Sequence, residues 1–95
     1  MEIEKIEDLF RSFEDNEYFK FDRVENKLSN RPDLHAFMLL ASLFPGTQDI
    51  ILSAEHDEVF LSITKKDIES LTEFHICELV RCGVRIDEGI LCLFI

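Results

Sequence analysis

The last twelve residues of the chain, 84–95, read VRIDEGILCLFI. Two runs rich in branched apolar side chains flank Asp87-Glu88-Gly89, and a glycine in so short a polar break is typical of a hairpin turn. Residues 90–95 carry no charged side chain, so as an exposed edge strand they would promote aggregation. We therefore predict a C-terminal hairpin whose second strand lies inside a sheet and is covered on at least one face.

Two short helices are expected immediately before this hairpin. Thr64 and Thr72 each precede an apolar pattern with helical spacing, and a threonine at such a position accepts a hydrogen bond from the first turn of a helix. Asp67 follows Thr64 at the spacing of a capping box. Gly83 stands where helices often end. We predict one helix beginning after Thr64 and a second running from Thr72 to Gly83.

A second hairpin is expected before these helices. Residues 49–52 and 59–63 are rich in branched and aromatic side chains, and the stretch between them, 53–58, is polar. We predict two antiparallel strands joined by a turn over 53–58.

The N-terminal half predicts two longer helices. Apolar residues recur at spacings of three and four through residues 2–14, the period of an amphipathic helix. Pro32 suits the first turn of the next helix, and Pro45-Gly46 ends it. Because the run 34–44 is apolar on nearly every side, we expect the helix over 32–44 to be central and buried.

The resulting order of elements is ααββααββ. In residues 18–30, the alternation at Phe19 and Phe21 suggests a short extended piece, whereas Phe21, Val24 and Leu28 fit a helical face. Given these two patterns, we expect an irregular connector there. The order predicts an α+β fold with about four helices packed on a mainly antiparallel sheet of about four strands. We expect a single domain over 1–95, with an N-terminal amphipathic helix in 1–17, the connector in 18–30 and an α+β core in 31–95.

Net charge limits the kinds of partner. Twenty Asp and Glu against ten Lys and Arg give a formal net charge of −10, and each third of the chain is net negative. Nucleic acids and anionic membranes are bound mainly through basic side chains. We therefore expect no direct nucleic-acid or membrane binding, and another protein as the partner. Both a partner with a basic surface and a homodimer are left open.

The cysteines indicate a reducing compartment. Cys77, Cys82 and Cys92 are odd in number, and the acidic start Met1-Glu2-Ile3-Glu4 differs from the basic start of a signal peptide. We expect a cytoplasmic protein whose cysteines are reduced and serve as small apolar side chains.

One turn holds three kinds of metal-binding side chain, His56, Asp57 and Glu58. Successive residues of a strand point to opposite faces, so at most two of the three converge, and a metal would need another ligand such as His35 or His75. A solvated turn is the simpler interpretation, and a metal site stays an alternative. His35, within an apolar run, is expected to be a core histidine.

No motif of catalysis or cofactor binding is found. The sequence has neither a Gly-x-Ser-x-Gly nor a Gly-x-Gly-x-x-Gly pattern, and its three glycines are too few for a phosphate loop. We expect no enzymatic activity and no cofactor.

Aromatic residues offer a candidate interaction surface. Half of the ten aromatic residues lie within residues 1–21. Most of them are expected to anchor the core, but aromatic side chains are also enriched at protein interfaces. With the polar residues of the connector they give these interaction candidates: Tyr18, Phe19, Asp22, Arg23 and Asn26.

Several stretches resemble small uncharacterised acidic proteins of phage and prophage-like regions. They are FDRV at 21–24, RPDLHAF at 31–37 and FPG at 44–46, with further similarity at 54–59 and 79–84. The resemblance covers roughly residues 20–95. It implies a bacterial or phage accessory protein and transfers no active site.

Together these observations predict a non-enzymatic protein-interaction or accessory module of phage or prophage type. One alternative is an acidic inhibitor that mimics nucleic acid on a basic partner, which requires carboxylates aligned on one surface. The other is a small metal-assisted enzyme that uses the turn of His56, Asp57 and Glu58.

Overall fold

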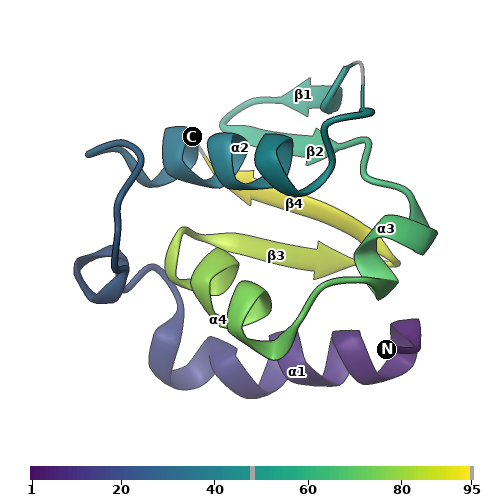
Figure 1. Cartoon of the computed structure of the whole chain (residues 1–95), viewed down its shortest axis with the longest axis horizontal. Helices are drawn as coiled ribbons and strands as arrows, with labels where there is room; N and C mark the ends of the chain where they lie inside the picture. Colours follow the sequence, from purple (N-terminus) through teal and green to yellow (C-terminus); the bar gives the residue numbers. More distant parts are fainter. Residues whose placement is uncertain (48, 95) are drawn as a thin grey trace.

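The computed structural model describes residues 1–47 and 49–94 (Figure 1). In chain order the elements are α1 (Ile3–Glu17), a 3₁₀ turn η1 (Phe21–Arg23), α2 (Pro32–Leu43), β1 (Ile51–Glu55), β2 (Glu58–Leu61), α3 (Lys65–Glu69), α4 (Glu73–Arg81), β3 (Val84–Asp87) and β4 (Ile90–Phe94). The α+β fold and its order ααββααββ are confirmed. The connector is irregular apart from η1.

The four strands form one antiparallel sheet in the order β1-β2-β4-β3. β4, the uncharged C-terminal strand, pairs with β2 on one side and β3 on the other, so its predicted interior position is confirmed. β1 and β3 are the two edge strands. In Figure 1, α2 passes in front of the sheet, and α4 lies between β3 and α1, which runs along the bottom of the view.

A single hydrophobic cluster joins the helices to the sheet. Directly paired residues of antiparallel strands point to the same face, and one face is built from Val59 paired with Leu93 and Val84 paired with Leu93. The fully buried Leu40 of α2 and Leu79 of α4 belong to the same cluster. Ile6 and Phe10 of α1 also belong to it, so the N-terminal helix shares the core of the sheet.

The two predicted helix starts are confirmed by their caps. The Thr64 hydroxyl accepts a hydrogen bond from the Asp67 backbone N–H at 3.2 Å. The Thr72 hydroxyl accepts from the His75 N–H at 3.2 Å, and the His75 ring accepts from the Thr72 N–H at 3.4 Å, which closes a capping box. Gly83, at φ +89°, takes the left-handed conformation that ends α4.

The first hairpin differs from the prediction. Ser53, Ala54 and Glu55 do not form a turn but pair with Phe60, Val59 and Glu58, which leaves a turn of only two residues, His56 and Asp57. Polar side chains are compatible with this strand because β1 is at an edge, where strand pairing depends on the backbone and side chains face solvent. The predicted turn over 53–58 was therefore too long.

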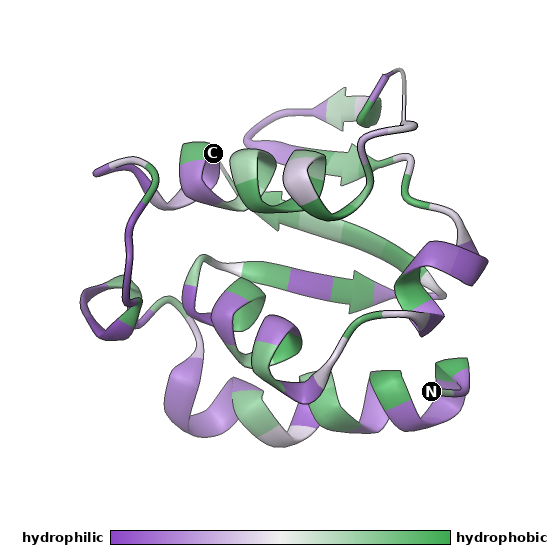
Figure 2. Ribbon diagram, in the orientation of Figure 1, coloured by the Kyte–Doolittle hydropathy of each residue, from purple (hydrophilic) through white to green (hydrophobic). Residues whose placement is uncertain are grey.

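The prediction that α2 is central and buried is wrong. Only His35, Ala36 and Leu40 are buried in this helix, whereas the side chains of Leu34 and Met38 are 43% and 47% exposed. Figure 2 shows α2 in the hydrophobic colour over most of its length, while α1 alternates between the two colours. The apolar character of α2 therefore continues onto the face that points away from the sheet.

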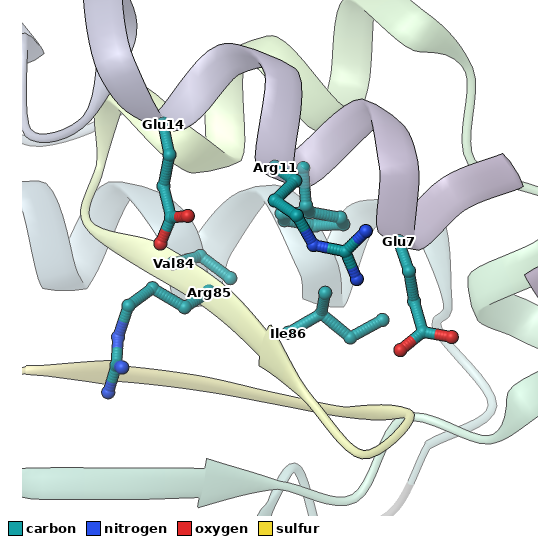
Figure 3. A pocket seen from close by; sticks show the side chains of 7 residues that line it. Glu7, Arg11, Glu14, Val84, Arg85 and Ile86 are labelled. Atoms are coloured by element: carbon teal, nitrogen blue, oxygen red, sulfur yellow. The ribbon is translucent and has the colours of Figure 1, made fainter. Parts of the chain in front are cut away.

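Helix α1 closes the β3 edge of the sheet. Side chains of Glu7, Arg11 and Glu14 extend from α1 towards β3 (Figure 3), and the hollow that they line together with Val84, Arg85 and Ile86 has a volume of ≈ 50 Å³. Within the described residues, no helix is long and apolar enough to span a bilayer.

Candidate docking groove between helix α2 and strand β1

A shallow apolar groove lies between α2 and the segment that leads into β1. Its volume is ≈ 370 Å³. Six of its seven lining residues are apolar and the seventh is a threonine: Phe37, Met38, Ala41, Phe44, Pro45, Thr47 and Ile50. A concave apolar surface of this size fits a few side chains of a partner.

Local sequence features build the groove. Phe37, Ala41 and Phe44 are three or four positions apart, so they lie along one side of α2 and its C-terminal end. The Phe44 N–H donates to the Leu40 carbonyl at 2.9 Å, the last bond of the helix. The Thr47 N–H then donates to the Phe44 carbonyl at 3.1 Å, so the chain turns back and places Ile50 opposite the helix.

Strand β1 directly follows the groove residue Ile50 and is an edge strand of the sheet. All five of its residues are exposed, with Ile51 at 45% and Leu52 at 59%. In a hairpin with a two-residue turn, the residues that flank the turn exchange both backbone hydrogen bonds, and the next pair exchanges none. Glu55 flanks the turn here, so the N–H and C=O of Ala54 point away from β2, towards solvent.

The surroundings of the groove are acidic. Residues 32–64, which hold α2, β1 and β2, contain five carboxylates and no Lys or Arg. Two of the carboxylates are paired with arginines outside this segment: Asp33 with Arg31, which lowers the pKa of Asp33, and Glu58 with Arg85. The side chains of Asp49, Glu55 and Asp57 are exposed.

A polar hollow of ≈ 620 Å³ adjoins the groove and shares Phe44, Pro45 and Thr47 with it. Its other lining includes the carboxylates of Asp49 and Asp67. Carboxylates therefore lie beside the groove at the start of β1 (Asp49) and again beyond the end of β1 (Glu55 and Asp57).

The residues predicted for interaction do not share this groove. Phe19 is 48% exposed, and its ring lies against Gly83, where an added Cβ would come within 2.6 Å of it. It lines a separate hollow that includes Phe94. Tyr18 is half-buried, and burial raises the pKa of its hydroxyl. These two residues close the end of α1 against α4 and the sheet.

The three candidates in the connector, Asp22, Arg23 and Asn26, also lie outside the groove lining. Arg23 binds the Glu17 carboxylate at 3.0 Å, and Arg81 binds the other oxygen of Glu17 at 2.6 Å. The hydrogen bond from Arg81 is the main reason that the pKa of Glu17 is lowered. Asp22 is exposed on η1, and Asn26 lines a different hollow beside His35. The five candidates thus lie around the connector without forming one pocket, and their role in binding stays a prediction.

His35 and Glu78 form a buried pair between α2 and α4. The Leu28 backbone N–H donates to His35 Nδ1 at 3.1 Å, and His35 Nε2 lies 3.7 Å from a Glu78 oxygen. Because Nδ1 accepts this hydrogen bond, Nε2 carries a proton, and it faces the carboxylate beyond hydrogen-bonding distance. The His35 side chain thus joins the connector to α2 and lies against Glu78 of α4.

The turn considered for metal binding is exposed at His56 and Asp57, whereas the Glu58 carboxylate is bound by Arg85. Within residues 1–47 and 49–94, no three His, Cys, Asp or Glu side chains are grouped to hold a metal ion. The three cysteines are free. Cys82 and Cys92 are buried, and desolvation raises their thiol pKa values to about 12 and about 11.

The chain shows no significant match to a protein-family model, a curated protein or a solved structure. The resemblance to prophage-like proteins therefore stays a prediction. Sequence reasoning missed the groove residues Met38 and Ala41 because they were assigned to a buried helix. The available signal was the all-round apolarity of 34–44: a chain of this size has too few other elements to cover every side of such a helix.

Proposed function

We propose that this protein is a non-enzymatic protein-interaction module and that its docking surface is the groove between α2 and β1. The observation that carries the proposal is the apolar groove between α2 and Ile50, which directly precedes the exposed edge strand β1. Contiguous exposed apolar surface bordered by polar residues is typical of protein-interaction sites. The three free cysteines support action in the reducing environment of a cytoplasm.

The distribution of acids does not favour the nucleic-acid-mimic alternative. Such a mimic needs an unbroken line of carboxylates at the spacing of phosphates. The densest row follows α1, but Arg11 lies between Asp8 and Asp15 and binds the Asp8 carboxylate at 3.0 Å. The apolar groove supports a protein partner more directly.

Selection of displayed random peptides on the immobilised protein tests the proposal. Peptides of about 16 residues are long enough to form either a strand or four helical turns. The test variant is Met38→Ser, which removes apolar contact from the groove. Its matched control is Leu34→Ser, one turn earlier on the same helix, with nearly the same exposure (43% against 47%) but outside the groove lining.

We expect retained peptides to bind the wild type and Leu34→Ser equally and to bind Met38→Ser about tenfold more weakly. Both side chains are half-exposed, so circular dichroism should show both variants folded. Recovery of no binding peptide, or of peptides that bind Met38→Ser as well as the wild type, would contradict a docking function for the groove.

A further inference from the structure

We infer that the occupant of the groove is an extended, basic segment of another protein, which adds to the sheet as a fifth strand beside β1. This inference rests on the proposed function, and it specifies the conformation and charge of the partner. Strand addition at an exposed sheet edge is a general mode of peptide recognition in which the backbone gives affinity and alternate side chains give specificity.

Strand β1 has backbone groups on its outer side that could pair with an added strand. β2 occupies one side of β1, and the outward N–H and C=O of Ala54 lie on the other side. An added strand would run about 4.8 Å from β1, within hydrogen-bonding distance of these groups. β1 is at the end of the sheet order and all five of its residues are exposed.

Alternate side chains of an added strand would point to the helix side of the sheet, the side on which α2 and the groove lie. Ala54 pairs directly with Val59, whose side chain is buried in the core beneath the helices, so Ala54 faces the helix side of the sheet. A partner residue opposite Ala54, and every second residue from it, would face the same side, towards α2. Apolar side chains at the alternate positions nearest Ile50, the groove residue next to β1, would enter the groove beside Met38 and Ala41.

Charge selects a basic partner. Asp49 lies just before β1, and Glu55 and Asp57 lie at its far end, all exposed. An added strand would therefore have carboxylates near both of its ends. Lys or Arg side chains flanking an apolar centre complement this arrangement, whereas acidic side chains would be repelled.

The same charges disfavour a second copy of this chain. In an antiparallel pairing of two β1 strands about Ser53, Asp49 of each copy would face Asp57 of the other. Each copy also carries a formal net charge of −10. Like charges directly opposite across strands destabilise the pairing.

The peptides selected on the groove supply the test. We expect their sequences to place apolar residues at every second position with Lys or Arg at the flanks. Replacing the flanking bases of a selected peptide by Glu should weaken binding at least tenfold in calorimetry. N-methylation of the alternate peptide amides that face β1 should weaken it by a similar factor, while N-methylation of the amides in between should change it little. A matched protein pair is Asp57→Lys, which should weaken binding, and Asp15→Lys on α1, which should not.

The following outcomes would overturn the inference of an added basic strand. They differ from the outcome that would contradict the proposed function. Groove-dependent peptides with apolar residues three and four positions apart would indicate a helical occupant. Acidic groove-dependent peptides, or insensitivity to N-methylation, would also contradict it. If sedimentation shows a dimer that Leu52→Lys dissociates, the occupant is a second copy. Peptides that bind Met38→Ser as well as they bind the wild type would instead contradict the proposed function.

Discussion

The two edge strands of the sheet, β3 and β1, differ in how they are covered. At the β3 edge, α1 packs alongside and leaves a gap of ≈ 50 Å³ (Figure 3). At the β1 edge, all five residues are exposed and a groove of ≈ 370 Å³ separates the start of the strand from α2. Both edge strands belong to hairpins with two-residue turns, but the pairing of β1 shifts register between Ile51 and Ser53, whereas that of β3 is regular. The cover also differs: α1 packs against β3, whereas all five residues of β1 are exposed, which is the basis of the docking surface that we propose there.

The largest expected effect comes from weakening the cover of β3. Phe10 of α1 is 3% exposed and lines the gap over Val84 and Ile86. We expect Phe10→Ala to lower the free energy of unfolding by about 3–5 kcal/mol, since it removes a buried aromatic side chain and leaves a cavity. Leu52→Ala on the bare edge, where the side chain is 59% exposed, should change it by less than about 0.5 kcal/mol. Urea unfolding measures both, and equal effects would show that the edges are not different in kind.

A smaller effect is expected in amide hydrogen exchange. Ser53 in β1 and Arg85 in β3 occupy matched positions. Each lies three residues before the first residue of its hairpin turn and pairs with a residue of the other strand of the hairpin. Because only β3 is covered by a helix, the Ser53 amide should exchange at least about tenfold faster than the Arg85 amide under native conditions. Equal protection, read by NMR, would mean that β1 opens only with the whole domain.

The smallest expected effect is on the pH dependence of thermal stability. The pKa of Glu17 is lowered from its ordinary 4.5, mainly by the hydrogen bond from Arg81, so its stabilising contribution is present above pH 4.5 and is lost as the pH falls through the folded-state pKa. We expect Glu17→Gln to lower Tm at pH 7 and the difference from the wild type to shrink progressively below pH 4.5. Asp15→Asn, an exposed neighbour on α1, serves as the control. A pH-independent difference would show that the Glu17–Arg81 pair does not help to hold the end of α1.

Sequence reasoning succeeded where local chemistry specifies the structure. The threonine caps of α3 and α4 and the Glu88-Gly89 turn, with φ values of +49° and +79°, follow from the residues themselves. It failed at 53–55, where polar side chains concealed a strand, because pairing with β2 depends on backbone atoms that every residue has. It also failed at α2, where the composition was read correctly as apolar but the conclusion that it is buried did not follow.

The order of helices and strands, the caps, the interior place of β4 and the acidity around residues 32–64 were all contained in the sequence, since each depends on side-chain type or on neighbours within a few positions. Which sheet edge receives α1, and which face of α2 is left uncovered, was decided only by tertiary packing. The physical reason is that one core of this size can cover only some of its apolar surfaces, and the choice among them depends on contacts between residues far apart in the chain.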